Sequence, residues 1–422
     1  MRMPSLLVVP VAMVLAVPTA QARPSAPADA AADVRELAAS IESIHPEPFR
    51  SVSKPRFTAA VDTLARQAPG LTRDQLLVGL LRVVALLGPH NGHTGLFPLD
   101  PEHRREFHFY PVRLYAFADG IFVVDEARGL GVRGSRLVAI AGVPVETALA
   151  QVEPLVSRDN ASNLRGLAPH YLLVAEVLAG LGITNGPGPT EFSFEQRDGE
   201  LVTRTLTPVP GHEYASAFQD ALFGHYPSIL PRAPRPLYLS GSGRTLWART
   251  LAGGRAVYVG YNAVVPPTPA MVRRLTRLVA GRAVRRVIVD VRLNGGGDNS
   301  TYGPLTSLFG SSQVDRRGRL YVLIGRATFS AAANFAAELD RDTRAIFVGE
   351  PTGGGVETYG DATSVLLPAT GWNVRIAARY HSRARGPNDR RLAVGADIAV
   401  PVTSAEYFSG RDPVLDRALR GL

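Results

Sequence analysis

The chain has 422 residues and a formal net charge of +9, and it contains no cysteine. The lack of cysteine excludes disulfides, a thiol nucleophile and a cysteine-ligated zinc site. The positive charge comes almost entirely from scattered arginines, with Lys54 as the only lysine. Because these arginines lack the aromatic interleaving of a nucleic-acid surface, we expect no nucleic-acid partner.

The first 22 residues have the pattern of a secretory signal peptide. Arg2 is followed by an apolar run over residues 6–17, and Ala20 and Ala22 form an A-x-A cleavage site. The run is shorter than the ~20 residues of a membrane-spanning helix, which argues against a membrane anchor. We expect cleavage near Ala22, export to the periplasm or the medium, and no stable membrane insertion.

Residues 23–104 are predicted to form an N-terminal helical subdomain. Apolar residues recur at helical spacing over 34–44 and again over 57–64. A third helix is predicted after Thr72, which is a favourable N-cap residue, and it ends near Gly88. The segment that follows, residues 90–95, reads His-Asn-Gly-His-Thr-Gly and brings two histidines close together in a loop.

From residue 105 to residue 209 the apolar pattern changes to a period of two. Strands are predicted over residues 112–115, 121–124 and 135–140, followed by a short helix from Glu146. A helical insert over 164–181 precedes a hairpin of residues 191–196 and 201–206. Residues 208–211, which are rich in proline and glycine, are predicted to be a linker.

Residues 210–422 alternate between strands and helices, which is typical of an α/β domain. A strand over 256–259 and a helix over 271–279 come first. Three apolar strands follow at residues 287–292, 320–324 and 345–348, and a closing hairpin over 365–380 turns at Thr370-Gly371. Taken with the segments before it, the chain is predicted to be a multidomain α/β protein.

Each of the three apolar strands leads into a short motif. The motifs are Asn-Gly-Gly-Gly at 294–297, Thr-Phe-Ser-Ala at 328–331, and Gly-Glu-Pro-Thr-Gly-Gly-Gly at 349–355. Ser330 begins a predicted helix, where the helix dipole favours a developing oxyanion, although an ordinary N-cap serine would occupy the same position. Glycines bring bare N–H groups close to a ligand, so one of them with the Ala331 N–H would form an oxyanion hole.

These motifs, in this order, resemble the C-terminal processing (tail-specific) peptidase family, which includes the tricorn core protease. The resemblance extends to residues 88–96 and to the Asp-Pro-Val-Leu of residues 412–415. It implies a crotonase-like β-β-α catalytic domain over 210–422, the N-terminal helical subdomain, and a PDZ-like module over 105–209. It further implies a serine endopeptidase that cleaves peptides or unfolded polypeptides without a metal or another cofactor.

The resemblance also implies roles for individual residues. Ser330 falls on the nucleophile, and Gly296 or Gly297, together with Ala331, falls on the oxyanion hole. Gly355 stands where the Ser-Lys branch of the family has its lysine, and the only lysine lies far away in the sequence. The chain therefore resembles the tricorn-like branch, in which His93 falls on the catalytic base; the alternative is that His93 caps the preceding helix.

The third member of the catalytic group stays open. Gly92 replaces the serine that precedes the histidine of tricorn, and the nearest acid to the expected glutamate is Asp389. Glu350 and Asp361 are alternative acids that would orient His93. An inactive ligand- or peptide-binding protein on the same scaffold is the second hypothesis, and a crotonase acting on a thioester is the third. The sequence predicts neither the preferred substrate sequence nor the oligomeric state.

Overall fold

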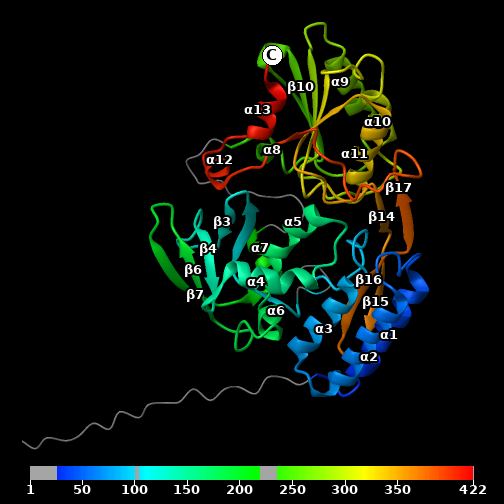
Figure 1. Ribbon diagram of the computed structural model, residues 1–422. Coiled ribbons are helices and arrows are strands. Elements are labelled where there is room, and N and C mark those ends of the chain that lie inside the picture. Colours follow the sequence, from blue (N-terminus) through cyan, green and yellow to red (C-terminus); the bar gives the residue numbers. More distant parts are fainter. Residues whose placement is uncertain (1–25, 99, 101–102, 104, 219–234, 422) are drawn as a thin grey trace, which may run out of the picture.

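A computed structural model describes residues 26–421, apart from 99, 101–102, 104 and 219–234 (Figure 1). The predicted signal peptide and its cleavage near Ala22 lie outside these residues. The described chain is a mixed α/β structure with several domains, as the sequence predicts. Among the described residues, no helix is both long and apolar enough to cross a membrane.

The N-terminal part consists of three helices, which confirms their prediction. They are α1 (Ala30–Ile44), α2 (Lys54–Gln67) and α3 (Arg73–Ala85). Thr72 begins α3 with a capping box, since its side chain accepts from the Gln75 N–H and the Gln75 side chain accepts from the Thr72 N–H. Their apolar faces form a core into which Leu37, Phe57 and Leu80 are fully buried.

A hairpin from late in the chain packs on these N-terminal helices. It consists of β15 (Thr363–Leu367) and β16 (Trp372–Ile376), and it turns at residues 370–371 as predicted. Trp372 is buried in the same core as α1, and the Asp33 carboxylate of α1 accepts hydrogen bonds from the Thr370 N–H and hydroxyl. Figure 1 shows this hairpin in orange beside the blue helices. The chain therefore returns to its N-terminal part before it ends.

The second part of the chain is built around an antiparallel sheet in the order β2-β3-β4-β6-β7, with β5 added beside β4. Helices α4 and α5 contact this sheet, and α6 contacts α3. The insert predicted as helical over 164–181 is split into α5 and α6 around residue 173. The elements are β2 (Val112–Phe117), β3 (Gly120–Glu126), β4 (Arg136–Ile140), β5 (Val143–Pro144), α4 (Val145–Val152), α5 (Ala161–Tyr171), α6 (Ala175–Gly180), β6 (Thr190–Glu195) and β7 (Leu201–Leu206).

The linker predicted over residues 208–211 is instead structured, and that prediction was wrong. Strand β8 (Val209–Pro210) pairs with β1 (His108–Phe109), and α7 (Gly211–Phe218) starts directly after it. The ring of Tyr214 in α7 stacks on Phe109 at a centroid distance of 5.0 Å, and both rings are buried. Burial of these aromatic side chains outweighs the turn preference of the proline and glycine residues.

The last part contains a six-stranded sheet in the order β18-β13-β12-β11-β10-β9. All neighbouring pairs are parallel except β10 with β9, so the sheet has one antiparallel edge strand. Its inner strands are buried apart from their first residues Arg286 and Ile346, which explains their continuous apolar sequences. The strands are β9 (Leu246–Leu251), β10 (Ala256–Tyr261), β11 (Arg286–Asp290), β12 (Leu320–Ile324), β13 (Ile346–Gly349) and β18 (Ile398–Ala399).

Helices cover both faces of this sheet. Residues of α9 (Pro269–Val279), α10 (Gly303–Phe309) and α11 (Ala331–Asp342) share one core with Val257, Val287 and Val322. On the other face, α13 (Pro413–Leu419) packs against Tyr258 and Ile288. The remaining elements are α8 (Leu237–Ser240), α12 (Ser404–Phe408), and the paired strands β14 (Glu357–Gly360) and β17 (Arg379–Ser382).

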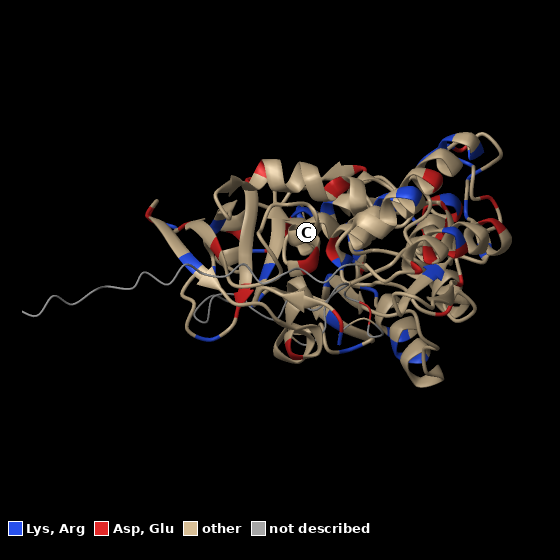
Figure 2. Cartoon of the chain, turned by 90° about the horizontal axis from the view of Figure 1, so that it is seen from below, with Lys and Arg blue, Asp and Glu red and all other residues tan. Residues whose placement is uncertain are grey.

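Basic and acidic residues are interspersed along the described chain (Figure 2). Many of them form ion pairs, such as Arg391 with Asp340 and Asp389, and Arg326 with Glu350. The three motif segments leave the carboxyl ends of β11, β12 and β13, which are neighbours in the sheet. Sites of open parallel sheets form at this edge, so the topology brings the three motifs together there.

Candidate active site

Ser330 occupies a strained turn between β12 and α11. It is the N-cap of α11, but its side chain makes no capping hydrogen bond to the helix. Its backbone has a φ of 51° and a ψ of −130°, a conformation that L-residues rarely adopt and that costs about 1–3 kcal/mol. Such a strand–turn–helix arrangement exposes a nucleophilic side chain, and here it leaves the hydroxyl free to meet another residue.

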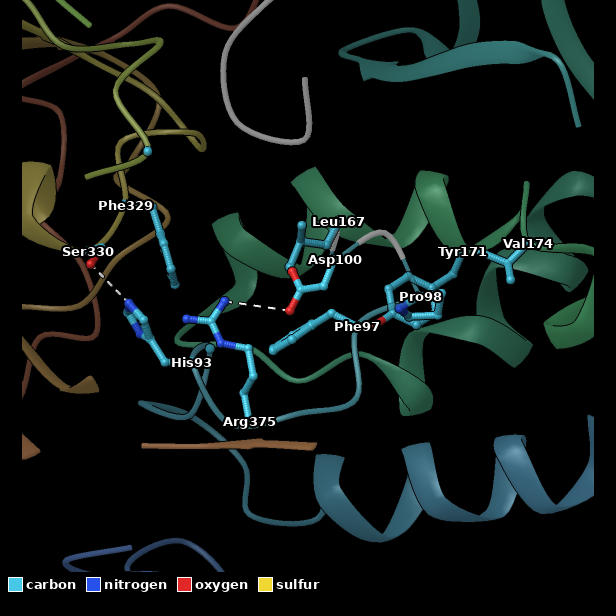
Figure 3. A pocket seen from close by; sticks show the side chains of 12 residues that line it. His93, Phe97, Pro98, Asp100, Leu167, Tyr171, Val174, Phe329, Ser330 and Arg375 are labelled. Atoms are coloured by element: carbon cyan, nitrogen blue, oxygen red, sulfur yellow. Dashed lines mark hydrogen bonds and ion pairs between the residues drawn. The ribbon is translucent and has the colours of Figure 1, made fainter. Parts of the chain in front are cut away.

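The residue that it meets is His93, from the loop after α3. Nε2 of His93 lies 3.0 Å from Oγ of Ser330 (Figure 3), and the imidazole stacks on Phe329 at a centroid distance of 4.6 Å. The loop is held in place by the late strands, because the Gly95 N–H donates to the Arg375 carbonyl and the Ala377 N–H donates to Thr94 Oγ1. A histidine at this distance from a serine hydroxyl is positioned to act as its base.

The surroundings of His93 favour its neutral form. Burial lowers the pKa of His93, Asp159 and Asp361 raise it, and the neighbouring Arg375 and His381 lower it. Nδ1 of His93 is buried and has no hydrogen-bond partner among the described residues. A neutral imidazole is the form that can accept the proton of a serine hydroxyl, and burial of His93 favours that form.

The glycine loop after β11 lies directly against Ser330. A Cβ on Gly296 would lie 2.7 Å from the Ser330 Cβ and 3.1 Å from the Ala331 backbone nitrogen, and Gly296 has a φ of +114°. Gly297 points elsewhere, because its Cβ would lie 2.0 Å from the Val264 carbonyl oxygen. The Gly296 N–H donates to Oδ1 of Asn294 at 3.0 Å, while the Ala331 N–H has no acceptor among the described groups.

A cavity of about 210 Å³ extends from Ser330 and His93 (Figure 3). On one wall, Arg375 pairs with Asp100 at 3.5 Å, and Gly295 of the glycine loop also lines the cavity. The volume exceeds the roughly 150 Å³ of a cavity that accommodates benzene. Most of its wall is apolar, formed by Phe97, Pro98, Leu167, Tyr171, Val174 and Phe329.

The three acids predicted as orienting residues are all engaged with cations. Asp389 pairs with Arg391 at 2.7 Å, which holds the pKa of that carboxyl well below its usual value. Glu350 makes two hydrogen bonds to Arg326, of 2.6 and 3.0 Å. Asp361 has a half-exposed side chain that pairs with Arg379 at 3.3 Å and lies 3.4 Å from His381, and its charge raises the pKa of His93. None of the three donates or accepts a described hydrogen bond at His93.

A fourth acid, Asp159, lies at the site and was missed by the sequence reasoning. It is fully buried, with Oδ1 accepting from the Gly92 N–H at 2.7 Å. Its Oδ2 accepts from the Thr358 hydroxyl at 2.8 Å and from the Gly355 N–H at 3.2 Å. An acid followed by asparagine before a helix is usually part of a cap, and Asn160 does cap α5, so the sequence carries no signal for another role.

Lys54 does not take part in the site. Its ammonium bonds to Glu42 at 2.6 Å on the N-terminal helices, and the side chain is largely exposed. Within the described part of the chain, no cluster of three histidine or acidic side chains could hold a metal ion.

Comparison with known proteins agrees with the sequence motifs. Residues 300–381, which include Ser330 and the glycine-rich loop after β13, match the model of peptidase family S41. This match confirms the resemblance to the C-terminal processing peptidases.

Solved structures of mature CPAF share the fold of this chain. The crystal structure of mature CPAF is 14% identical with a TM-score of 0.63, and the match covers 92% of this chain and 95% of that one. Mature CPAF complexed with lactacystin gives 14% identity and a TM-score of 0.63, with 92% and 97% covered. The photosystem II D1 C-terminal processing protease is 16% identical over 91% of this chain and 98% of that one, with a TM-score of 0.40.

Proposed function

We propose that this chain is a serine peptidase that cleaves peptides or unfolded polypeptides through an acyl-enzyme on Ser330. The observation that carries the proposal is the 3.0 Å contact between Ser330 Oγ and His93 Nε2 at the end of an apolar cavity. The match to peptidase family S41 supports a peptidase independently of this contact. Arg2, the apolar run of residues 6–17 and the predicted cleavage site at Ala22 favour an exported enzyme.

The first half of the reaction forms the acyl-enzyme. His93 Nε2 accepts the proton of the Ser330 hydroxyl while Oγ bonds to the scissile carbonyl carbon. The oxyanion that forms is held by the Ala331 N–H and by an N–H of the glycine loop at 295–297. His93 then gives its proton to the leaving amine as the carbon–nitrogen bond breaks.

The second half releases the product. Water attacks the acyl carbon, His93 accepts a proton from that water, and the proton returns to Ser330 Oγ as the ester bond breaks. His93 must therefore gain and lose a proton twice in each cycle. A base whose pKa is lowered by burial returns readily to its neutral form.

The cavity suggests the size and polarity of the substrate side chain next to the scissile bond. Its volume and its wall of Leu167, Tyr171 and neighbouring rings fit a large apolar side chain such as phenylalanine or leucine. The Arg375–Asp100 pair adds polar groups to a wall that is otherwise apolar. We therefore propose that the enzyme prefers substrates with a large apolar residue at that position.

The test is covalent labelling of the purified protein with a fluorophosphonate, read by intact mass. We expect one adduct on the wild type and none on Ser330→Ala, and slow or no labelling of His93→Ala. Lys54→Ala is the matched control and should label like the wild type. Lactacystin, which is bound in a CPAF crystal structure, should slow the labelling if it reaches the same serine.

Hydrolysis of a denatured protein completes the test. Wild type and Lys54→Ala should cleave it, and Ser330→Ala should not. A folded wild-type protein that takes no adduct and cleaves nothing would contradict the peptidase proposal and favour a binding protein on this scaffold.

A further inference from the structure

Gly92 is enclosed on two sides, and no side chain fits at this position. A Cβ there would lie 2.9 Å from Oδ1 of Asp159 and 2.9 Å from the ring of Phe329. Carbon atoms at such distances must displace one of their neighbours. Residue 92 directly precedes His93, and the Asp159 carboxylate and the Phe329 ring occupy the space that a side chain there would need.

Asp159 connects the loop that carries His93 to the glycine-rich segment after β13, which lies against the serine turn. Through Oδ1 it holds the Gly92 N–H, and through Oδ2 it holds the Gly355 N–H and the Thr358 hydroxyl. Its own carbonyl accepts from the His90 N–H at 3.1 Å. The neighbouring Gly354 packs on the serine turn, since a Cβ there would lie 3.1 Å from the Ser330 nitrogen.

The Asp159 carboxylate also acts on His93 through its charge, which raises the pKa of His93. It is fully buried, and its hydrogen-bond donors among the described residues are all neutral. A charge in such surroundings acts strongly on a neighbouring ionisable group. His93 is that group, because Asp159 is the foremost of the charges that raise the pKa of His93, while Arg375 and His381 oppose it and Asp361 adds to it from the exposed side.

We propose that Asp159 is the positioning acid of this site: it fixes the His93 loop through Gly92 and stabilises protonated His93 by its charge, without a hydrogen bond to Nδ1. This proposal rests on the proposed function, since protonated His93 matters only if His93 is the base. In this proposal Asp159 has the role of orienting His93, which the sequence suggested for Asp389, Glu350 or Asp361.

The first test measures His93 directly and needs no activity. Proteins labelled at histidine are titrated by NMR in the Ser330→Ala background, with the His93 signal assigned by a His93→Gln variant. We expect Asp159→Asn to lower the pKa of His93 by about one unit, because a nearby carboxylate typically raises a neighbour's pKa by about one to three units. Thr358→Val is the matched control, since it removes a hydrogen bond to Oδ2 but keeps the charge, and it should leave the pKa within a few tenths.

The second test measures the pH dependence of peptide cleavage. In Asp159→Asn we expect kcat to fall about 10- to 100-fold and the acidic limb of kcat/KM to move to lower pH by about one unit. Thr358→Val should keep the limb in place. A loss of activity with an unmoved limb and an unchanged His93 titration would leave Asp159 a purely structural residue and overturn the charge part of the proposal.

A second variant covers the case in which Asp159→Asn does not fold. Gly92→Ala keeps the carboxylate but crowds its contact with the His93 loop, because the new Cβ would lie 2.9 Å from Oδ1 of Asp159 and 2.9 Å from the ring of Phe329. We expect a lower pKa of His93 and a kcat reduced at least 10-fold. An unchanged pKa and kcat in folded Gly92→Ala would overturn the proposal, whereas failure of fluorophosphonate labelling in the wild type would overturn the peptidase function alone.

Discussion

Replacement of Ser330 by glycine should stabilise the protein relative to replacement by alanine, although we expect neither variant to cleave peptides. Ser330 has a φ of 51°, which costs about 1–3 kcal/mol for a residue with a Cβ. Alanine keeps this strain, whereas glycine removes it and loses about 0.5–1 kcal/mol through its more flexible unfolded chain. Both variants lose the hydrogen bond to His93, so this loss cancels in the comparison. The expected difference is about 1 kcal/mol in favour of glycine.

The assay is equilibrium unfolding in urea of both variants. At an m-value of ~3 kcal/mol/M, the midpoint of Ser330→Gly should lie about 0.3 M above that of Ser330→Ala. Ala59→Gly is the control, because this exposed position on α2 has ordinary helical geometry and should lose about 1 kcal/mol. An equal or lower midpoint for Ser330→Gly would show that the turn at Ser330 stores no strain and would refute the reasoning.

Three further predictions follow from other parts of the structure. Burial lowers the pKa of His170 from 6.5 to about 4, so the unfolded state binds more protons than the folded state between these pH values. The unfolding free energy should therefore fall by roughly 3 kcal/mol as the pH is lowered from 6.5 to 4. His170→Gln should lose that pH dependence in urea titrations. Arg292→Ala should lower the unfolding free energy by about 3–5 kcal/mol in the same assay, because it leaves the buried carboxylates of Asp290 and Asp412 without their cation. Leu167→Trp should fill the cavity and reduce kcat/KM for peptides with phenylalanine at the scissile bond at least 10-fold, with unchanged fluorophosphonate labelling; equal rates would place the substrate side chain elsewhere.

The sequence by itself determined the secondary structure around the site and the position of its serine at a strand-to-helix turn. The β-branched runs became β11, β12 and β13, the capping residue Thr72 began α3, and Ser330 came to lie at a strand-to-helix turn. These features depend on neighbours within a few residues, through side-chain alternation, capping and the conformational freedom of glycine. Local patterns of this kind are readable without the fold. The linker predicted at residues 208–211 failed because burial of Tyr214 and Phe109, which are distant in sequence, overrode the local turn preference.

Only the tertiary structure decided which side chains meet. Ser330 and His93 are 237 positions apart, and their contact depends on how the N-terminal helices, the β15–β16 hairpin and the sheet pack together. The same packing turned Gly296 toward Ser330 and paired Asp389 with an arginine. It also buried Asp159 beside the His93 loop, where the sequence shows only the start of a helix. Charge partners and buried positions are set by residues distant in sequence, so the choice of an acid depends on packing that no local pattern encodes.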